Sequence, residues 1–276
     1  MISKNLPVEN PGHYNYTMKI LIQLFFVFTI SILYSFQGLN VDKNNQDWIQ
    51  IFNGNDLEGW KVKINGFPAG EDKFNTFKVK DNSLVVSYEN YDHFKNYFGH
   101  IFYKNPYSNY RLRLDYRFVG NQCKGGEGWA TKNSGVMIHS QSPESMEINQ
   151  EFPVSIEVQL LGGIQKPWKR TTANLCTPGT HVNINNKLVT THCMSSSSET
   201  FYGEEWVNLE IEVNNDSIIK HYINGKEVFS YTNPTIGGQY NTLKDKKGDR
   251  LKEGYISLQS ESHPIEFKNI ELLILQ

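Results

Sequence analysis

The sequence has no surplus of basic residues, since 27 Lys and Arg stand against 29 Asp and Glu in 276 residues. The formal net charge is −2, and this balance argues against a nucleic-acid partner, which would require a basic surface. A helical pattern longer than two turns is also missing, as is any repeat of fixed period. Aromatic residues reach 13% and glycines number 21, which favours strands and turns over a helix bundle.

The motifs of several common enzyme classes are missing as well. The chain has no Walker loop, no HExxH, no GxSxG and no GxGxxG, so the usual nucleotide-binding, metalloprotease and serine-hydrolase classes lose support. Cysteine is scarce, and the three cysteines form no CxxC pair, which argues against a structural zinc site.

One long apolar run lies near the N-terminus. Residues 20–34 read ILIQLFFVFTISILY and follow Met18 and Lys19, a pattern typical of a secretory signal peptide. We predict a signal peptide at 1–37, with Met18 as a second candidate start, and a single domain at 38–276. The run is shorter than the roughly 20 residues of a spanning helix, so we expect cleavage, no stable membrane span, and a periplasmic or extracellular protein. An uncleaved membrane anchor is the alternative.

Export would allow the cysteines to form a disulfide, because disulfides persist in the periplasm and outside the cell. Cys176 and Cys193 enclose a loop rich in Thr, Asn and Ser. We predict that these two residues pair and leave Cys123 free; the alternative is three unpaired buried thiols.

Short apolar runs alternate with turn signals from residue 48 onward. Residues 110–118 read YRLRLDYRF, a strict alternation that predicts a strand with one buried face. Asn224-Gly225 is typical of a hairpin turn. Ten or more such strands predict an all-β, two-sheet jelly-roll sandwich. Long loops are expected at 62–76, 119–132, 162–182, 190–205 and 232–253.

The strand expected at 155–161 carries polar residues on one face. Alternation places Glu157 and Gln159 together, opposite three apolar neighbours. Burying such groups unpaired costs on the order of a few kcal/mol, so the face is either a ligand site or a solvated outer face. Because one of the two polar residues is an amide, this strand cannot supply both groups of a two-carboxylate glycosidase.

Further candidates are polar or aromatic residues at strand ends and in loops. Gln259 and Glu261 share one side if their strand continues, and the indole of Trp129 suits stacking on a sugar ring. The others are Asn133, His139, Arg170 and His181.

Eight short segments follow one another in a recognisable order. Four of them are 51–60 (IFNGNDLEGW), 77–85 (FKVKDNSLV), 133–136 (NSGV) and 157–159 (EVQ). The other four are 203–206 (GEEW), 223–228 (INGKEV), 254–259 (GYISLQ) and 267–270 (FKNI). Together they resemble the 3-keto-disaccharide hydrolase domain family over essentially residues 48–276. Phe77 and Asn82 stand where the family pattern has Trp and Gly.

The resemblance implies a concanavalin A-like lectin/glucanase sandwich and an exported enzyme that cleaves glycosides oxidised at C3 of glucose. Such a ketone acidifies the C2 proton, so one base and one acid suffice for elimination of the C1 aglycone, followed by hydration. The matching motifs contain Asn133, Glu157, Gln159 and Gln259, of which Glu157 is the expected base. A non-catalytic lectin-like module is the main alternative, and a conventional two-carboxylate glycosidase is the third.

The remaining roles come from polarity and position. His139 or His181 would protonate the leaving oxygen, and Arg170 or a metal would stabilise the enediolate. For a divalent cation, suitable ligands are His139, Glu157 and Glu261. The substrate-binding set expected for a carbohydrate comprises Asn133, Gln159, Arg170, Gln259, Glu261 and Trp129.

Overall fold

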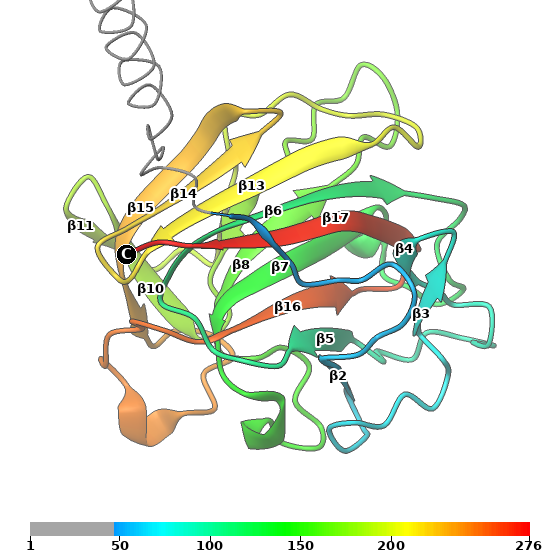
Figure 1. Cartoon of the computed structure of the whole chain (residues 1–276), viewed down its shortest axis with the longest axis horizontal. Helices are drawn as coiled ribbons and strands as arrows, with labels where there is room; N and C mark the ends of the chain where they lie inside the picture. Colours follow the sequence, from blue (N-terminus) through cyan, green and yellow to red (C-terminus); the bar gives the residue numbers. More distant parts are fainter. Residues whose placement is uncertain (1–46) are drawn as a thin grey trace, which may run out of the picture. The chain divides into compact units, whose positions relative to one another are not determined.

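Two antiparallel sheets lie face to face in the structure, a computed structural model that describes residues 47–276 (Figure 1). The predicted signal peptide at 1–37 and its boundary lie outside the described residues. Residues Asp47–Gln276 form one unit, and none of its helices is long and apolar enough to cross a membrane.

The larger sheet contains ten strands, of which β1 (Ile49–Gln50) pairs with β17 at its side. The other nine follow in the order β11 (Lys187–Val189), β10 (Thr180–Ile184), β15 (Lys226–Ile236), β14 (Ile218–Ile223), β13 (Val207–Asn214), β6 (Asn109–Phe118), β17 (Ile265–Ile274), β4 (Ser83–Val86) and β3 (Phe77–Lys80).

The smaller sheet carries the candidate site and contains seven strands. Their order is β12 (Cys193–Met194), β9 (Asn174–Cys176), β8 (Ile156–Leu161), β7 (Asn133–Ser140), β16 (Tyr255–Ser260), β5 (Gly99–Tyr103) and β2 (Trp60–Ile64). Three short 3-10 helices lie in the connections: η1 (Gly128–Ala130), η2 (Pro143–Ser145) and η3 (Lys244–Lys246).

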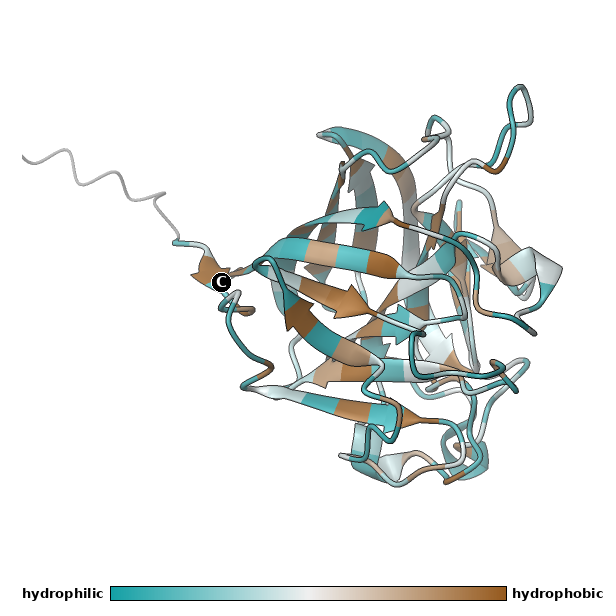
Figure 2. Cartoon of the chain, turned by 90° about the vertical axis from the view of Figure 1, so that its right-hand side faces the viewer, coloured by the Kyte–Doolittle hydropathy of each residue, from teal (hydrophilic) through white to brown (hydrophobic). Residues whose placement is uncertain are grey.

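The core lies between the sheets and is built from alternate residues. In β6, the buried side chains of Leu112, Leu114 and Tyr116 belong to the same cluster as Val158 and Leu160 of β8. Burial of one large apolar side chain contributes about 1.5–3 kcal/mol, so these rows hold the sheets together. The hydropathy colours alternate along the strands accordingly (Figure 2).

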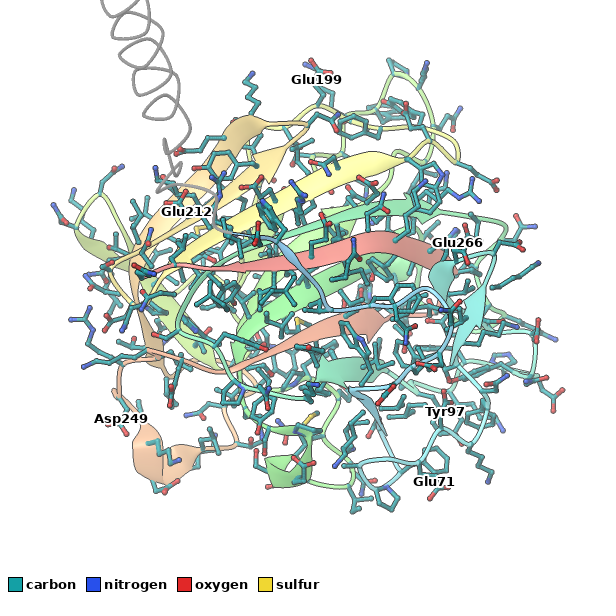
Figure 3. All side chains as sticks on the ribbon, in the orientation of Figure 1. Glu71, Tyr97, Glu199, Glu212, Asp249 and Glu266 are labelled. Atoms are coloured by element: carbon teal, nitrogen blue, oxygen red, sulfur yellow. A yellow bond between two sulfur atoms is a disulfide. The ribbon has the colours of Figure 1, made fainter. Side chains whose placement is uncertain are left out.

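The outer face of the larger sheet carries paired charges. Glu266 of β17 accepts a hydrogen bond from Nε of Arg117 of β6 at 2.8 Å, and the Nη2 of Arg117 lies 2.7 Å from the same carboxylate oxygen as an ion pair (Figure 3). Exposed pairs of this kind contribute about 0–1 kcal/mol each, and here they form a solvated surface away from the candidate site.

The all-β sandwich and the hairpin turn at Asn224-Gly225 agree with the predictions from the sequence. Four of the five expected long loops, however, contain parts of strands. β2 extends to Ile64, β9 lies within 162–182, β12 lies within 190–205, and β15 continues to Ile236. Segments of two or three residues are too short to show a period of two, so the sequence pattern did not predict β9 and β12 as strands.

Candidate active site

A cavity of about 440 Å³ opens on the face of the smaller sheet that points away from the core. The alternation along β8 creates this face, because Glu157 and Gln159 line the cavity while Val158 is fully buried in the core. Asn133 of β7 and Cys176 of β9 line the cavity from the neighbouring strands. The outward face of β8 is therefore a pocket floor and not a solvated surface.

A glycine makes room for the Glu157 carboxyl group. Gly135 of β7 pairs with Gln159 of β8, two positions along from the pair of Met137 and Glu157 and on the same face of the sheet. A β-carbon on Gly135 would lie 2.8 Å from both Cγ and Oε1 of Glu157, which is closer than real contacts allow. The missing side chain thus lets the carboxyl lie over the neighbouring strand.

Two buried carboxyl groups face the cavity, and their protonation is linked. Glu157 is 5% exposed, and burial raises its pKa to about 8. Glu261, which follows β16, is 4% exposed; burial and then the charge of Glu157 raise its pKa, against the opposing effect of Arg170. Two such groups cannot both ionise at low cost, so Glu157 loses its proton first, as the pH rises through about 8, while Glu261 keeps its own. An ionised and a protonated carboxyl in one cavity can act as base and acid.

Amide side chains surround this pair. Asn174 donates from Nδ2 to Oε1 of Gln159 at 3.2 Å, which fixes the Gln159 amide with its own N–H group available to the cavity. Asn133 lines the cavity, and its buried Oδ1 has no hydrogen-bond partner. Gln259 is fully buried and lies outside the cavity lining, beside His100 of β5, with both amide atoms unpartnered.

Aromatic side chains form part of the walls. Trp129 is 54% exposed and stacks on Phe98, with ring planes 16° apart and centroids 6.2 Å apart. Phe152 and Tyr240 form a second pair with centroids 5.4 Å apart. Exposed aromatic faces beside polar groups suit ligands that present both C–H faces and hydroxyls.

Arg170 lies outside the cavity lining and has a different task from the one expected. Its Nη1 donates to the carbonyl oxygens of Thr131, Lys132 (3.1 Å) and Gly162 (3.0 Å), and its Nη2 donates to that of Trp129 (2.9 Å). The guanidinium is therefore engaged by backbone carbonyls and fixes the turn that carries Trp129. Its Nη1 and Nη2 groups are thus occupied by backbone carbonyls and not available as donors to an enediolate.

His139 and His181 also lie outside the cavity lining. His139 has a φ of 48°, which breaks the alternation of β7, and its Nε2 is 3.0 Å from the carbonyl oxygen of Asn215. His181 belongs to β10 of the larger sheet, where its ring packs so closely on Gly238 that a β-carbon there would lie 2.6 Å away. Neither histidine is placed to protonate a leaving group in this cavity.

The expected metal ligands are not brought together, because His139 turns away from the two carboxyls. Within residues 47–276, no three or more His, Cys, Asp or Glu side chains gather closely enough to hold a metal ion. The structure thus supplies a carboxyl pair rather than the three-residue ligand set expected from the sequence.

Cys176 and Cys193 form a disulfide between β9 and β12, and both line the cavity, whereas Cys123 is free. The sequence reasoning missed several other lining residues. His192, next to Cys193 in the sequence, also lines the cavity. Glu127, Glu151 and Tyr240 lie in loops, where no periodic pattern could reveal them.

Fold and cavity together define a two-sheet β-sandwich with a polar pocket on the outer face of its smaller sheet. The chain belongs to the family of 3-keto-alpha-glucoside-1,2-lyase-like domains, whose model matches residues 47–273. This match confirms the resemblance noted from the eight segments.

Solved structures of low sequence identity share the fold. A candidate glycosyl hydrolase from Parabacteroides distasonis is 20% identical, with a TM-score of 0.51 over 86% of this chain and 98% of its own. A second from the same organism is 16% identical, with a TM-score of 0.50 over 83% and 100%. A carbohydrate-binding module from Bacillus subtilis is 12% identical, with a TM-score of 0.46 over 79% and 98%. No curated protein matches the chain.

Proposed function

We propose that this protein is an exported enzyme that cleaves 3-keto-glycosides by removal of the C2 proton and elimination of the aglycone from C1. The observation that carries the proposal is the pair of buried carboxyls, Glu157 and Glu261, on one cavity. The family match supports the substrate class.

Glu157 is the base and Glu261 the acid. The charge of Glu157 raises the pKa of Glu261, so the proton stays on Glu261 when one carboxyl is ionised. Glu157 takes the C2 proton, and the C2–H electron pair forms an enediolate with the C3 carbonyl. The enediolate collapses to a C1=C2 double bond as the C1–O bond breaks, and the leaving oxygen takes the proton of Glu261. A lyase releases this enone, whereas a hydrolase adds water across the double bond.

The enediolate needs hydrogen-bond donors, since Arg170 is engaged elsewhere. Asn174 holds the amide oxygen of Gln159, which leaves the N–H group as the part of this cavity-lining side chain that can donate, and Asn133 contributes a second amide. Donors fixed before the reaction stabilise developing negative charge without reorganisation. Trp129 supplies a surface on which a sugar ring can stack.

A non-catalytic carbohydrate-binding module is the second candidate. The stack of Trp129 on Phe98 favours it, because an exposed aromatic platform serves binding alone equally well. In the cavity, the carboxyl pair is the feature that an enzyme needs and a binding module does not. The deciding experiment must therefore measure turnover and not affinity.

The deciding experiment incubates the protein with plain and C3-oxidised disaccharides and follows release of glucose. We expect release only from the oxidised sugar, slower reaction when C2 carries deuterium, and at least about a 10²-fold loss in Glu157→Gln. The control is Glu144→Gln, which removes a carboxylate paired with Lys61 outside the cavity. Equal activity on plain disaccharides would indicate an ordinary glycosidase, and binding without release would indicate a lectin-like module.

A further inference from the structure

A second depression of about 510 Å³ adjoins the cavity and has no part in the chemistry above. The two share Glu151, Phe152 and Tyr240 as walls, so they are continuous. We call the second depression the outer groove; its remaining lining residues come from 147–150 and 241–244. A ligand seated over the carboxyl pair can therefore extend past Tyr240 into the outer groove.

The outer groove offers the groups that bind sugar hydroxyls. Asn149 and Asn241 each carry an amide with donors and an acceptor, which matches a hydroxyl that both donates and accepts. The Oγ1 of Thr242 is buried and has no hydrogen-bond partner. Tyr240 stands between cavity and groove and is 42% exposed, so one ring surface is available to a pyranose.

Both sides of the outer groove are held in place by internal hydrogen bonds. Gln150 is 6% exposed; its Nε2 donates to Oε1 of Gln141 at 2.9 Å and to the carbonyl oxygen of Phe152 at 2.8 Å. On the other side, Oδ1 of Asn241 accepts from the backbone N–H of Leu243 at 2.8 Å. A groove fixed before binding loses less entropy when a ligand enters.

The charges select an uncharged ligand. The cavity wall includes the carboxyls of Glu127, Glu151, Glu157 and Glu261, and none of its described lining residues is Lys or Arg. A carboxylated or sulfated sugar would find no lining cation to pair with there and would meet acidic side chains instead. The outer groove adds Glu147 and Lys244, which largely offset each other.

We propose that the outer groove is an aglycone subsite for a neutral saccharide, so that the protein acts on oligosaccharides longer than two units. The placement of the oxidised ring over Glu157 and Glu261 rests on the proposed function. In the bound substrate, the aglycone extends out of the cavity past Tyr240. Its second and later rings occupy the outer groove.

The test compares di- and tetrasaccharides of glucose, each with α-1,4, β-1,4 or β-1,3 linkages, after C3 oxidation of the terminal ring. For at least one linkage, kcat/KM should be about tenfold higher for the tetrasaccharide. Asn149→Ala and Thr242→Val should each reduce the ratio of the two values about fivefold, since each removes one hydrogen bond. Asn105→Ala, an exposed asparagine in the β5–β6 turn, is the matched control and should leave the ratio unchanged.

A second experiment measures affinity without turnover. The Glu157→Gln variant is titrated with the same di- and tetrasaccharides before their oxidation. Tighter binding of the tetrasaccharide that is lost in the groove variants supports the subsite. Equal affinity and equal kcat/KM for the two lengths in every linkage overturn it. Length-dependent binding with no turnover of any oxidised sugar overturns the proposed function and leaves the subsite standing.

Discussion

The carboxyl group of Glu157 occupies the space that a side chain at position 135 would need. A β-carbon on Gly135 would lie 2.8 Å from both Cγ and Oε1 of that glutamate. The position of the expected base is therefore set by the neighbouring strand and not by β8 alone. A glycine in the middle of a strand weakens it, so the gap under the carboxyl has a structural cost.

Gly135→Ala should displace the carboxyl and lower kcat for a C3-oxidised disaccharide by about 10²-fold, because a shift of about 1 Å can cost this much. Steady-state kinetics measure the effect. Gly128→Ala is the control, since a β-carbon there meets nothing within 4 Å. Wild-type kcat in Gly135→Ala would show that the position of the Glu157 carboxyl does not limit the reaction.

The unfolding free energy should depend on pH through Glu157. Its pKa is about 8 in the folded protein and about 4.3 in an unfolded chain, so folding favours the protonated form. This contribution is complete below about pH 4.3 and is lost as the pH rises through 8. The Glu157→Gln variant lacks this pH-dependent loss of stability. Its unfolding free energy relative to that of the wild type should therefore increase between pH 5 and pH 8.

Denaturant unfolding at several pH values measures this difference. Burial lowers the pKa of His221 to about 4 and has the opposite effect on stability, but it is common to both proteins and cancels. In Glu144→Gln the difference from wild type should stay flat above pH 5, because Lys61 lowers the pKa of the Glu144 carboxyl. A flat difference for Glu157→Gln as well would mean that its folded pKa is near the ordinary value.

Arg170→Lys should raise KM more than it lowers kcat. A lysine cannot satisfy the four carbonyl oxygens that Arg170 holds, so the turn with Trp129 loses its support. The double variant Arg170→Lys with Trp129→Ala should bind the substrate no worse than Trp129→Ala alone. Additive effects in this cycle would show that the arginine acts on the substrate by another route.

Loss of the disulfide should lower the unfolding free energy by about 3 kcal/mol, the value expected for a loop of this size. Cys176 and Cys193 are 17 positions apart in the sequence. Unfolding of the double variant Cys176→Ser/Cys193→Ser measures the change, and Cys123→Ser serves as the control because Cys123 is free. Equal losses in both proteins would point to an effect of serine substitution rather than of the bond.

The strand pattern was predictable where alternation is long. Nine alternating residues at 110–118 lie within β6, and the pattern at 155–161 separates Glu157 and Gln159 from the core. Each of these strands has one apolar face that the fold must bury, which is why the sequence carries the signal.

The residues that make up the site were harder to predict from the sequence. His139 was expected to protonate the leaving oxygen, but its positive φ and the carbonyl oxygen of Asn215 turn it away from the cavity. Arg170 was expected at the substrate, whereas four backbone carbonyls hold it elsewhere. The walls at Trp129, Glu151 and Tyr240 come from three separate connections, and contacts between distant loops leave no local pattern in a sequence.

The short strand β12 has a consequence beyond the cavity. It forms one edge of the smaller sheet with only two residues, and within residues 47–276 it pairs with β9 alone. A free sheet edge is a template on which other chains can add strands and aggregate. The bond between Cys176 and Cys193 keeps this two-residue cap in place. Reduction of this bond would release the cap, expose the edge of β9 and make the protein prone to self-association, so the disulfide protects the sheet edge as well as the pocket wall.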